Sequence, residues 1–164
     1  MAALIRVMAG CALAIAVTGL LALGLGQPML FPSLGPTVMM LAQHPGRAVC
    51  EPRSVMLAHG AGLIAGWLSL ELCGLRGTPS ALAAGLDAAH VVAAALSVAL
   101  TVAATRLARA PHPPAGATTL IVSLGLLPTL FDLLIMWAAI ACATTVMSAY
   151  NRCTGQPAPL WRAG

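Results

Sequence analysis

The sequence contains no lysine and little charge of either sign. Its 164 residues include eight basic side chains, all of them arginine, and four acidic ones, so only 7% of the chain is charged. An ordinary soluble domain carries about 25% charged residues. Disorder is excluded too, because disordered chains are polar and rich in charge. With 60% hydrophobic residues, the sequence predicts an integral membrane protein.

Other absences exclude several function classes. The net charge of +4 is spread along the chain and only 4% of residues are aromatic, so we expect no nucleic-acid partner. The five cysteines form no CxxC pair and the four histidines no i, i+4 pair, so we expect no metal site. Neither a nucleophile elbow nor a phosphate loop is present. We therefore expect no enzyme and no cofactor.

Six apolar segments organise the chain. Four are near the ~20 residues that a membrane-spanning helix needs, at residues 4–25, 54–75, 82–105 and 131–150. Two are shorter, at 33–41 and 115–127, and each follows a helix-breaking stretch that contains prolines, at 26–32 and 110–114. The sequence thus predicts an all-α membrane protein with four full transmembrane helices and two broken half-helices, in one membrane domain over 1–164.

The arginines predict how the chain is threaded. If all six segments carry the chain across, seven arginines lie on one side and only Arg76 lies on the other; the seven are Arg6, Arg47, Arg53, Arg106, Arg109, Arg152 and Arg162. Cytoplasmic loops of membrane proteins are rich in arginine and lysine. We therefore expect both termini and the short 151–164 tail in the cytoplasm, and the protein in a bacterial inner membrane.

A short motif recurs before the two half-helices. Residues 32–37 read P-x-x-G-x-T, and residues 113–118 read the same, 81 residues later. Each copy stands between two long segments, so the chain reads long–short–long twice, over about 4–75 and 82–150. Because each unit crosses three times, the second is inverted relative to the first, which is a common plan of transporters.

The inverted plan predicts a site where the two half-helices begin. Each extended leg covers about half of the hydrocarbon thickness, so the two helix N-termini face each other near the midplane, where their N–H groups favour a small anion. Gly35 and Gly116 let a ligand approach the backbone, and Ser33 is a candidate cap. The alternative is that these glycines serve helix packing and the prolines only break helices. The predicted binding residues are Pro32, Ser33, Leu34, Gly35, Thr37, His112, Pro113, Pro114, Ala115, Gly116, Ala117 and Thr118.

Ionisable residues inside membrane segments are candidates for function. We expect His59, Arg106 and Arg109 to line the cytoplasmic approach to the site, although His59 is equally compatible with a buried core histidine. The acidic residues Glu71, Asp87 and Asp132 fall toward the outer ends of their helices. A ring of acids there opposes anions unless the acids pair with Arg76 or are protonated.

Gly62 and Gly66 form a GxxxG pair, which permits close helix crossing within one chain or between chains. A bundle of this size favours a homo-oligomer.

The segment from Ala110 to Leu120, APHPPAGATTL, resembles the signature of the HPP family of integral membrane proteins. The Pro32–Gly35 stretch, the Pro52–His59 stretch and Asn151-Arg152 are similar to the family as well. The resemblance implies four membrane-spanning helices. Plastid and cyanobacterial relatives are implicated in nitrite transport, which implies a small monovalent anion. Pro36 stands where the family is expected to have alanine, and it removes one N–H from the first half-helix.

The leading hypothesis is a channel or carrier for a small anion, most of all nitrite, in a lipid bilayer. One alternative is a pore for a neutral or protonated solute such as nitrous acid, which the outer acids favour. Another is a non-transporting membrane module that assembles with a partner.

Overall fold

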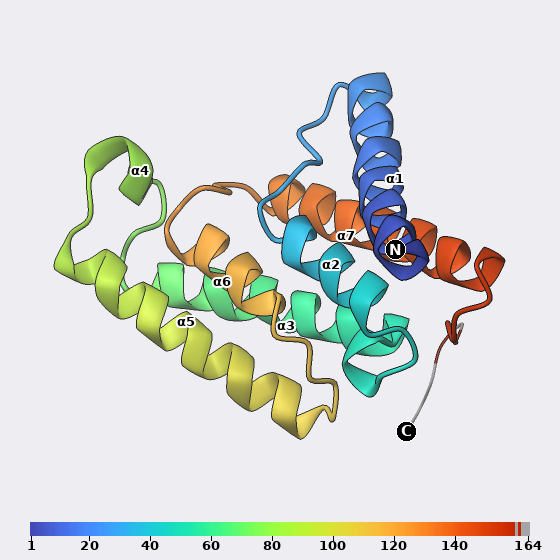
Figure 1. The fold of residues 1–164 in the computed structure, drawn as a ribbon. Helices are drawn as coiled ribbons and strands as arrows, with labels where there is room; N and C mark the ends of the chain where they lie inside the picture. The colour runs from blue at the N-terminus through green and yellow to red at the C-terminus, as the bar shows by residue number, and fades with distance from the viewer. Residues whose placement is uncertain (160, 162–164) are drawn as a thin grey trace.

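The computed structural model describes residues 1–159 and 161, and over these residues the chain is helical with no strand (Figure 1). Arg162, one of the arginines expected in the cytoplasm, lies outside the described residues. The elements in order are α1 (Ala2–Leu25), α2 (Leu34–Gln43), the 3-10 turn η1 (Ala48–Cys50), α3 (Pro52–Leu72), α4 (Ala81–Ala84), α5 (Ala88–Leu107), α6 (Ala115–Ser123) and α7 (Leu130–Cys153).

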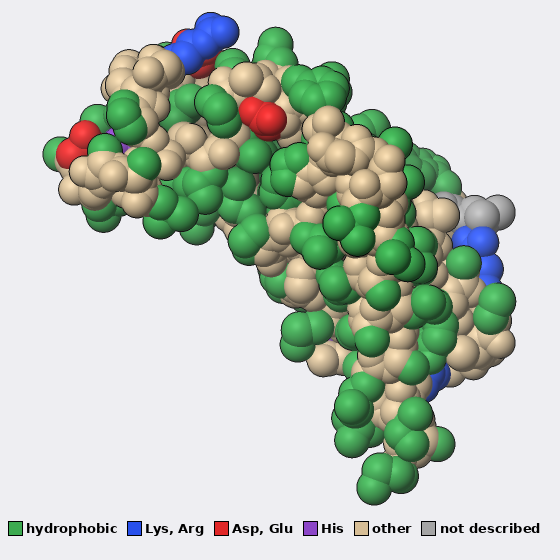
Figure 2. Space-filling view, turned by 90° about the horizontal axis from the view of Figure 1, so that it is seen from above, with side chains coloured by type: hydrophobic (Ala, Val, Ile, Leu, Met, Phe, Trp, Pro, Cys, Tyr) green, Lys and Arg blue, Asp and Glu red, His purple; other side chains and the backbone are tan. Residues whose placement is uncertain are grey.

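Four of these helices, α1, α3, α5 and α7, are long and apolar enough to cross a membrane. Much of their surface is exposed and hydrophobic, as lipid contact requires. Figure 2 shows hydrophobic side chains over most of the visible face, with a few charged side chains toward its edges. The predicted all-α class with four spanning helices is confirmed.

The two long–short–long units are interlocked. The first is α1, α2 and α3, and the second is α5, α6 and α7, with the four-residue helix α4 between them. The first long helix of each unit packs on the last helix of the other unit, so α1 lies against α7 and α5 lies against α3. The helices α3 and α7 also contact each other. In Figure 1 the short helices α2 and α6 run in opposite directions.

The repeat extends beyond the motif into the buried faces of α3 and α7. Residues with the same 81-residue offset as the two motifs are buried in both helices, which places the two helices in equivalent environments. The matched pairs are Val55 with Met136, Ala58 with Ala139, His59 with Ile140, Gly62 with Ala143, Leu63 with Thr144, Gly66 with Met147 and Leu70 with Asn151.

Some boundaries differ from those predicted, for identifiable reasons. The third long segment, expected to begin at residue 82, is broken by Gly85, whose φ of 91° is left-handed. The spanning helix α5 then begins after Asp87, whose carboxylate accepts the His90 N–H as an N-cap. Helix α6 ends at Ser123 and not at 127, because the chain turns at Gly125 with φ 77°.

The arginine-rich segments gather at one end of the fold. Arg6 in α1 donates to the Ala42 carbonyl at the end of α2, and Arg53 in α3 donates to the carbonyls of Ala108 and Arg109 after α5. Tyr150 near the end of α7 donates to the Arg6 carbonyl. Arg76 lies elsewhere, paired with Glu71 after α3. The grouping of segments that the arginines predict is therefore present.

The GxxxG pair of α3 packs within the chain, on α6. A Cβ added to Gly62 would lie 2.9 Å from the carbonyl oxygen of Ala115, and one added to Gly66 would lie 2.8 Å from that of Thr119. Real Cβ atoms do not approach a backbone oxygen so closely. The pair thus holds the second half-helix against α3, which resolves the choice that the sequence left open.

We expect Gly66→Ala to destabilise the protein by about 1–3 kcal/mol, the usual cost of overpacking, because the new methyl also meets Val122 at 2.7 Å. The matched control is Gly60→Ala in the same helix, where the added carbon has only Trp137 Nε1, at 3.6 Å. Thermal unfolding in detergent measures both variants. Equal midpoints for the two would contradict the packing argument.

Candidate functional site

The two P-x-x-G-x-T motifs form matching helix starts. Helix α2 begins after Ser33 and helix α6 begins after Pro114. Each is preceded by a leg of irregular backbone, the first leg at residues 26–33 and the second at 108–114. Equivalent positions share their burial: Pro32 and Pro113 are exposed, Gly35 and Gly116 are half-buried, and four further positions are buried in both copies. These are Ser33 with Pro114, Leu34 with Ala115, Thr37 with Thr118, and Val38 with Thr119.

His59 of α3 joins the two helix starts. Its Nε2 lies 3.0 Å from the Thr37 hydroxyl of α2, and its Nδ1 lies 2.7 Å from the Thr118 hydroxyl of α6. All three side chains are buried, with none of their surface exposed. One imidazole therefore bridges the equivalent threonines of the two repeats. His59 was expected along the approach, and it lies instead between the two half-helices.

The bonds around His59 assign its tautomer. Thr37 gives its only hydroxyl hydrogen to the Ser33 carbonyl at 2.7 Å, so it can only accept from the ring. Nε2 of His59 must then carry the hydrogen, and in the neutral ring Nδ1 accepts from the Thr118 hydroxyl. Every donor and acceptor of the neutral imidazole is used, which suits a buried site of low dielectric.

The glycines of the two motifs border open space. Among the described residues, no atom lies within 4 Å of a Cβ added to Gly35 or to Gly116. The sequence allowed a second role for Gly35 and Gly116, close packing between helices. That role belongs to Gly62 and Gly66, and Gly35 and Gly116 do not have it. The absence of a side chain leaves the backbone of both helix starts accessible to a small ligand.

The free backbone donors differ between the two starts. The N–H groups of Ala115, Gly116 and Ala117 donate to the carbonyls three residues earlier, at 3.0–3.1 Å. The predicted set of free N–H groups is therefore wrong for α6, because its first turn is tightened by these bonds. At α2, Leu34 donates to Phe31, whereas the Gly35 N–H has no acceptor in the part of the chain that the structure describes.

Ser33 stands at the N-cap of α2 as predicted but does not cap it. Its φ and ψ of −69° and −19° are helical, and its side chain makes no cap bond. The Ser33 hydroxyl is buried and has no hydrogen-bond partner among the described residues. Buried polar atoms without a partner are rare and costly, so this hydroxyl is a candidate ligand-binding group.

His112 lies at the end of the second leg and faces His59. Its Nδ1 lies 2.7 Å from the Val49 carbonyl of the 44–51 segment, and the two histidine ring centroids are 5.1 Å apart. The side chain is 3% exposed, and its Nε2 has no partner within the described ranges. His112 thus joins the predicted cluster.

The arginines predicted to line the approach lie at the surface. Arg106 is in the last turn of α5 and Arg109 follows it, and both residues are exposed. Arg109 has a φ of 49°, unusual for a residue with a side chain. Arg53, which the sequence did not single out, donates to the carbonyl groups there. These charges surround the start of the second leg, outside the buried cluster.

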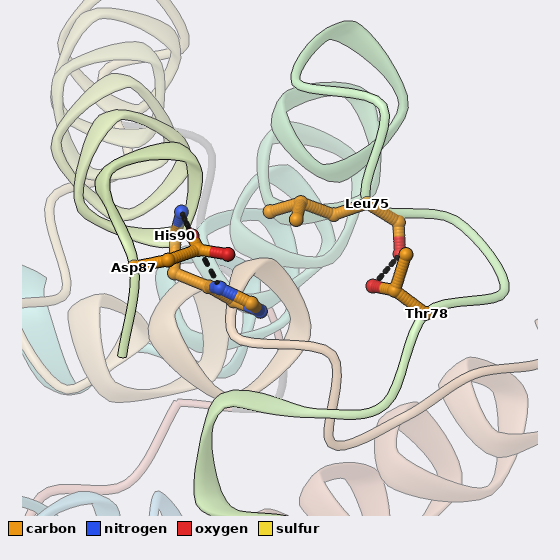
Figure 3. Close-up of polar contacts among 4 residues, drawn as sticks. All are labelled: Leu75, Thr78, Asp87 and His90. Carbon is orange, nitrogen blue, oxygen red and sulfur yellow. Dashed lines mark hydrogen bonds and ion pairs between the residues drawn. The ribbon is translucent and has the colours of Figure 1, made fainter. Parts of the chain in front are cut away.

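The outer acids are each engaged locally. Glu71 forms an ion pair of 2.8 Å with Arg76, and Asp132 completes a capping box with Thr129 at the start of α7. Asp87 accepts from the N–H and the ring Nδ1 of His90, as Figure 3 shows. These two hydrogen bonds from His90 hold the pKa of the Asp87 carboxyl below its ordinary value. The acids therefore have structural roles and form no bare anionic ring.

Other buried polar groups were not foreseen. Ser97 of α5 donates to Ser123 of α6 at 3.1 Å, and the Thr119 hydroxyl is buried without a partner in the described chain. In the sequence, Ser97, Thr119 and Ser123 are marked only by a hydroxyl within an apolar segment. Such hydroxyls are too common in this chain to predict a polar cluster. These three extend the polar region from Thr118 along α6.

No group of three or more His, Cys, Asp or Glu within the described residues is placed to hold a metal ion. The surface has two apolar grooves. One, of about 800 Å³, is lined mainly by α3, α5 and α7, and the other, of about 730 Å³, is lined by α1 and the leg that follows it. Neither groove contains a predicted binding residue. The chemistry available at the site is hydrogen bonding by hydroxyls, imidazoles and one free N–H.

We expect Thr37 and Thr118 to be energetically coupled, because they share one imidazole. In a cycle of Thr37→Val, Thr118→Val and the double variant, the interaction energy should be about 0.5–1.5 kcal/mol. Denaturant unfolding in detergent measures it. Thr37→Val combined with Thr145→Val, whose exposed hydroxyl bonds only within α7, should be additive, and additivity in both cycles would refute the bridge.

A family model described as "HPP, transmembrane region" matches residues 1–159. Comparisons with curated proteins and with solved structures find no match.

Proposed function

Because this chain belongs to the HPP family of integral membrane proteins, we propose that it moves a small monovalent anion across the membrane, with nitrite the leading candidate. One observation carries the proposal: His59 holds two equivalent threonines from opposite half-helices. Broken helices that meet inside a bundle are how many transporters build their substrate sites. Nitrite itself rests on the family resemblance.

The groups around the bridge suit a small ion with few ligands. The Gly35 N–H and the Ser33 hydroxyl belong to one helix start, and both lack a partner within the described chain. Donors of this kind replace the water around an anion, and the positive end of a short helix adds to the attraction. The open space beside Gly35 and Gly116 admits the ligand.

In this conformation the His59 ring fills the gap between Thr37 and Thr118. Passage then requires the imidazole to leave one threonine. Release of Thr37 frees the first half-helix, and release of Thr118 frees the second, so the same ring can serve both sides of an alternating route. The contacts group α1 and α2 with α7, and α5 and α6 with α3. These two groups of helices, which meet through α3 and α7, are the bodies that rock against each other in such a route.

We place the arginine-rich end in the cytoplasm, with the N-terminus and the 151–159 segment there. Homo-oligomer formation stays a prediction, now without the GxxxG pair, which is occupied by α6.

The glycine variants test the site. Gly35→Ala and Gly116→Ala should fold normally, because the added methyl has no neighbour within 4 Å among the described residues and alanine favours a helix. Nitrite uptake into proteoliposomes should nevertheless fall about tenfold or more in Gly35→Ala, where the methyl covers the free N–H and one hydrogen bond of about 1.5–3 kcal/mol to an ion is lost. The fall should be smaller in Gly116→Ala, whose N–H is already bonded to the Pro113 carbonyl and whose methyl only narrows the open space. Gly24→Ala, an exposed α1 position with equally free space, is the control and should keep wild-type flux. Unchanged nitrite flux in both Gly35→Ala and Gly116→Ala would show that the anion does not bind at these helix starts.

Two native cysteines test the orientation. Cys153 is exposed at the end of α7, and Cys73 is half-buried at the end of α3, near Arg76. In single-cysteine variants, a membrane-impermeant maleimide should label Cys73 in intact cells and Cys153 only in inverted vesicles. Labelling of Cys153 from outside would reverse the proposed topology.

A further inference from the structure

The His112 ring, whose centroid lies 5.1 Å from that of the bridging His59 ring, has a lone pair without a partner among the described residues. A carbonyl oxygen only accepts, so the Nδ1 that lies 2.7 Å from the Val49 carbonyl carries the hydrogen. In the neutral ring, Nε2 is then unprotonated. This nitrogen is buried, since His112 is 3% exposed, and it has no partner within the described residues.

His59 cannot bind a second proton without breaking the hydrogen bond that joins it to Thr118. Both of its nitrogens are engaged by Thr37 and Thr118, and a second proton on Nδ1 would leave the Thr118 hydroxyl without its acceptor. The His112 ring, 5.1 Å away, has a nitrogen free to change its protonation with no hydrogen bond lost. Two imidazolium ions at this distance repel each other, so one of the pair is charged at most.

An anion at this cluster meets a charge problem. A buried anion is costly unless a cation accompanies it, and the repulsion is greatest beside the lone pair of Nε2. Of the arginines at this end, Arg47, Arg106, Arg109 and Arg152 are exposed. Arg53 is occupied by the carbonyls of Ala108 and Arg109. Arg6 donates to the Ala42 carbonyl and has one buried guanidinium nitrogen without a partner among the described residues. The charged or titratable groups on the elements that contact His112 are Arg53, His59 and, at the far end, Glu71 of α3; His44, Arg47, Cys50 and the buried Glu51 of the 44–51 segment; and Arg106 and Arg109 before the second leg.

We propose that His112 is a proton-binding residue and that the anion crosses together with one proton held on its Nε2. The proton adds to the Nε2 lone pair as the anion arrives, and the new N–H donates to an anion oxygen. When the anion leaves on the other side, the proton returns to water there, and the ring is neutral again. The inference rests on the proposed anion transport and assigns its coupling ion.

The ion pair makes the transported unit neutral. An anion and an imidazolium in contact cost far less to hold in a low dielectric than the anion alone. Flux through such a site follows the proton gradient and does not respond to membrane potential. A simple anion channel behaves in the opposite way.

The experiment uses the full chain in proteoliposomes that contain a pH-sensitive dye, with the potential set by potassium and valinomycin and the flux of empty vesicles subtracted. Nitrite is the probe. We expect nitrite uptake with acidification of the interior, one proton per anion, at a rate that rises about tenfold for each unit that the external pH is lowered and is unchanged when the potential is reversed.

His112→Asn separates the protein's proton from the solute's. The asparagine amide can still donate to the Val49 carbonyl, but it has no nitrogen that binds a proton, so the dependence of the flux on pH should disappear. His44→Asn, at an exposed position after α2, is the control and should behave as wild type. The fold of each variant is checked by its thermal midpoint. If His112→Asn does not fold, His112→Gln, whose amide also donates a hydrogen bond and binds no proton, takes its place.

The outcomes are distinguishable. Uptake that follows the potential without acidification would overturn proton coupling and leave anion transport standing. Full electroneutral, pH-dependent uptake in His112→Asn would assign the proton to the solute, as nitrous acid, and overturn the role of His112. No uptake above empty vesicles would defeat the proposed function itself.

Discussion

The structure depends on the contact of one imidazole with two threonines. A membrane chain can leave regular helix only where the freed polar groups find partners inside the protein. Here the two irregular legs end at Ser33 and Pro114, and His59 ties the helices that follow. Without that ring, two short helices of ten and nine residues would face a gap, and the Thr118 hydroxyl would lose its hydrogen-bond acceptor.

The small residues of α3 make this contact possible. Gly62 and Gly66 bring α3 close enough to α6 that the Thr118 hydroxyl reaches the ring of His59, one turn earlier on α3. Close packing and hydrogen bonding are thus supplied by neighbouring positions on one helix. The acids and arginines lie near or beyond the ends of helices, where Asp87 and Asp132 cap helices and Glu71 pairs with Arg76. The polar groups in the interior of the bundle are neutral.

The sequence predicted what depends on averages over many residues. Segment hydropathy located the four long helices, the distribution of arginine grouped the segments at one end, and the repeated motif marked both helix starts. It did not predict the role of His59, because a lone histidine in an apolar helix reads the same whether it fills space or joins two elements. The pairing of the Gly116 N–H also escaped prediction, since a tightened first turn is decided by the geometry of the leg. The break at Gly85 was missed because the hydrophobic run continues across it.

The two repeats are not equivalent at the residue that joins them. The position in α7 that matches His59 holds Ile140. The space between the two inverted repeats holds only one bridging side chain. Only one of the two equivalent positions can therefore be a histidine that bridges the repeats. As a result, the two halves bind the ring differently. Thr118 donates its hydroxyl hydrogen to Nδ1 of His59, whereas Thr37 accepts the hydrogen on Nε2. The centre of the molecule is therefore asymmetric: separating Thr118 from the ring breaks an O–H···N bond, and separating Thr37 from it breaks an N–H···O bond.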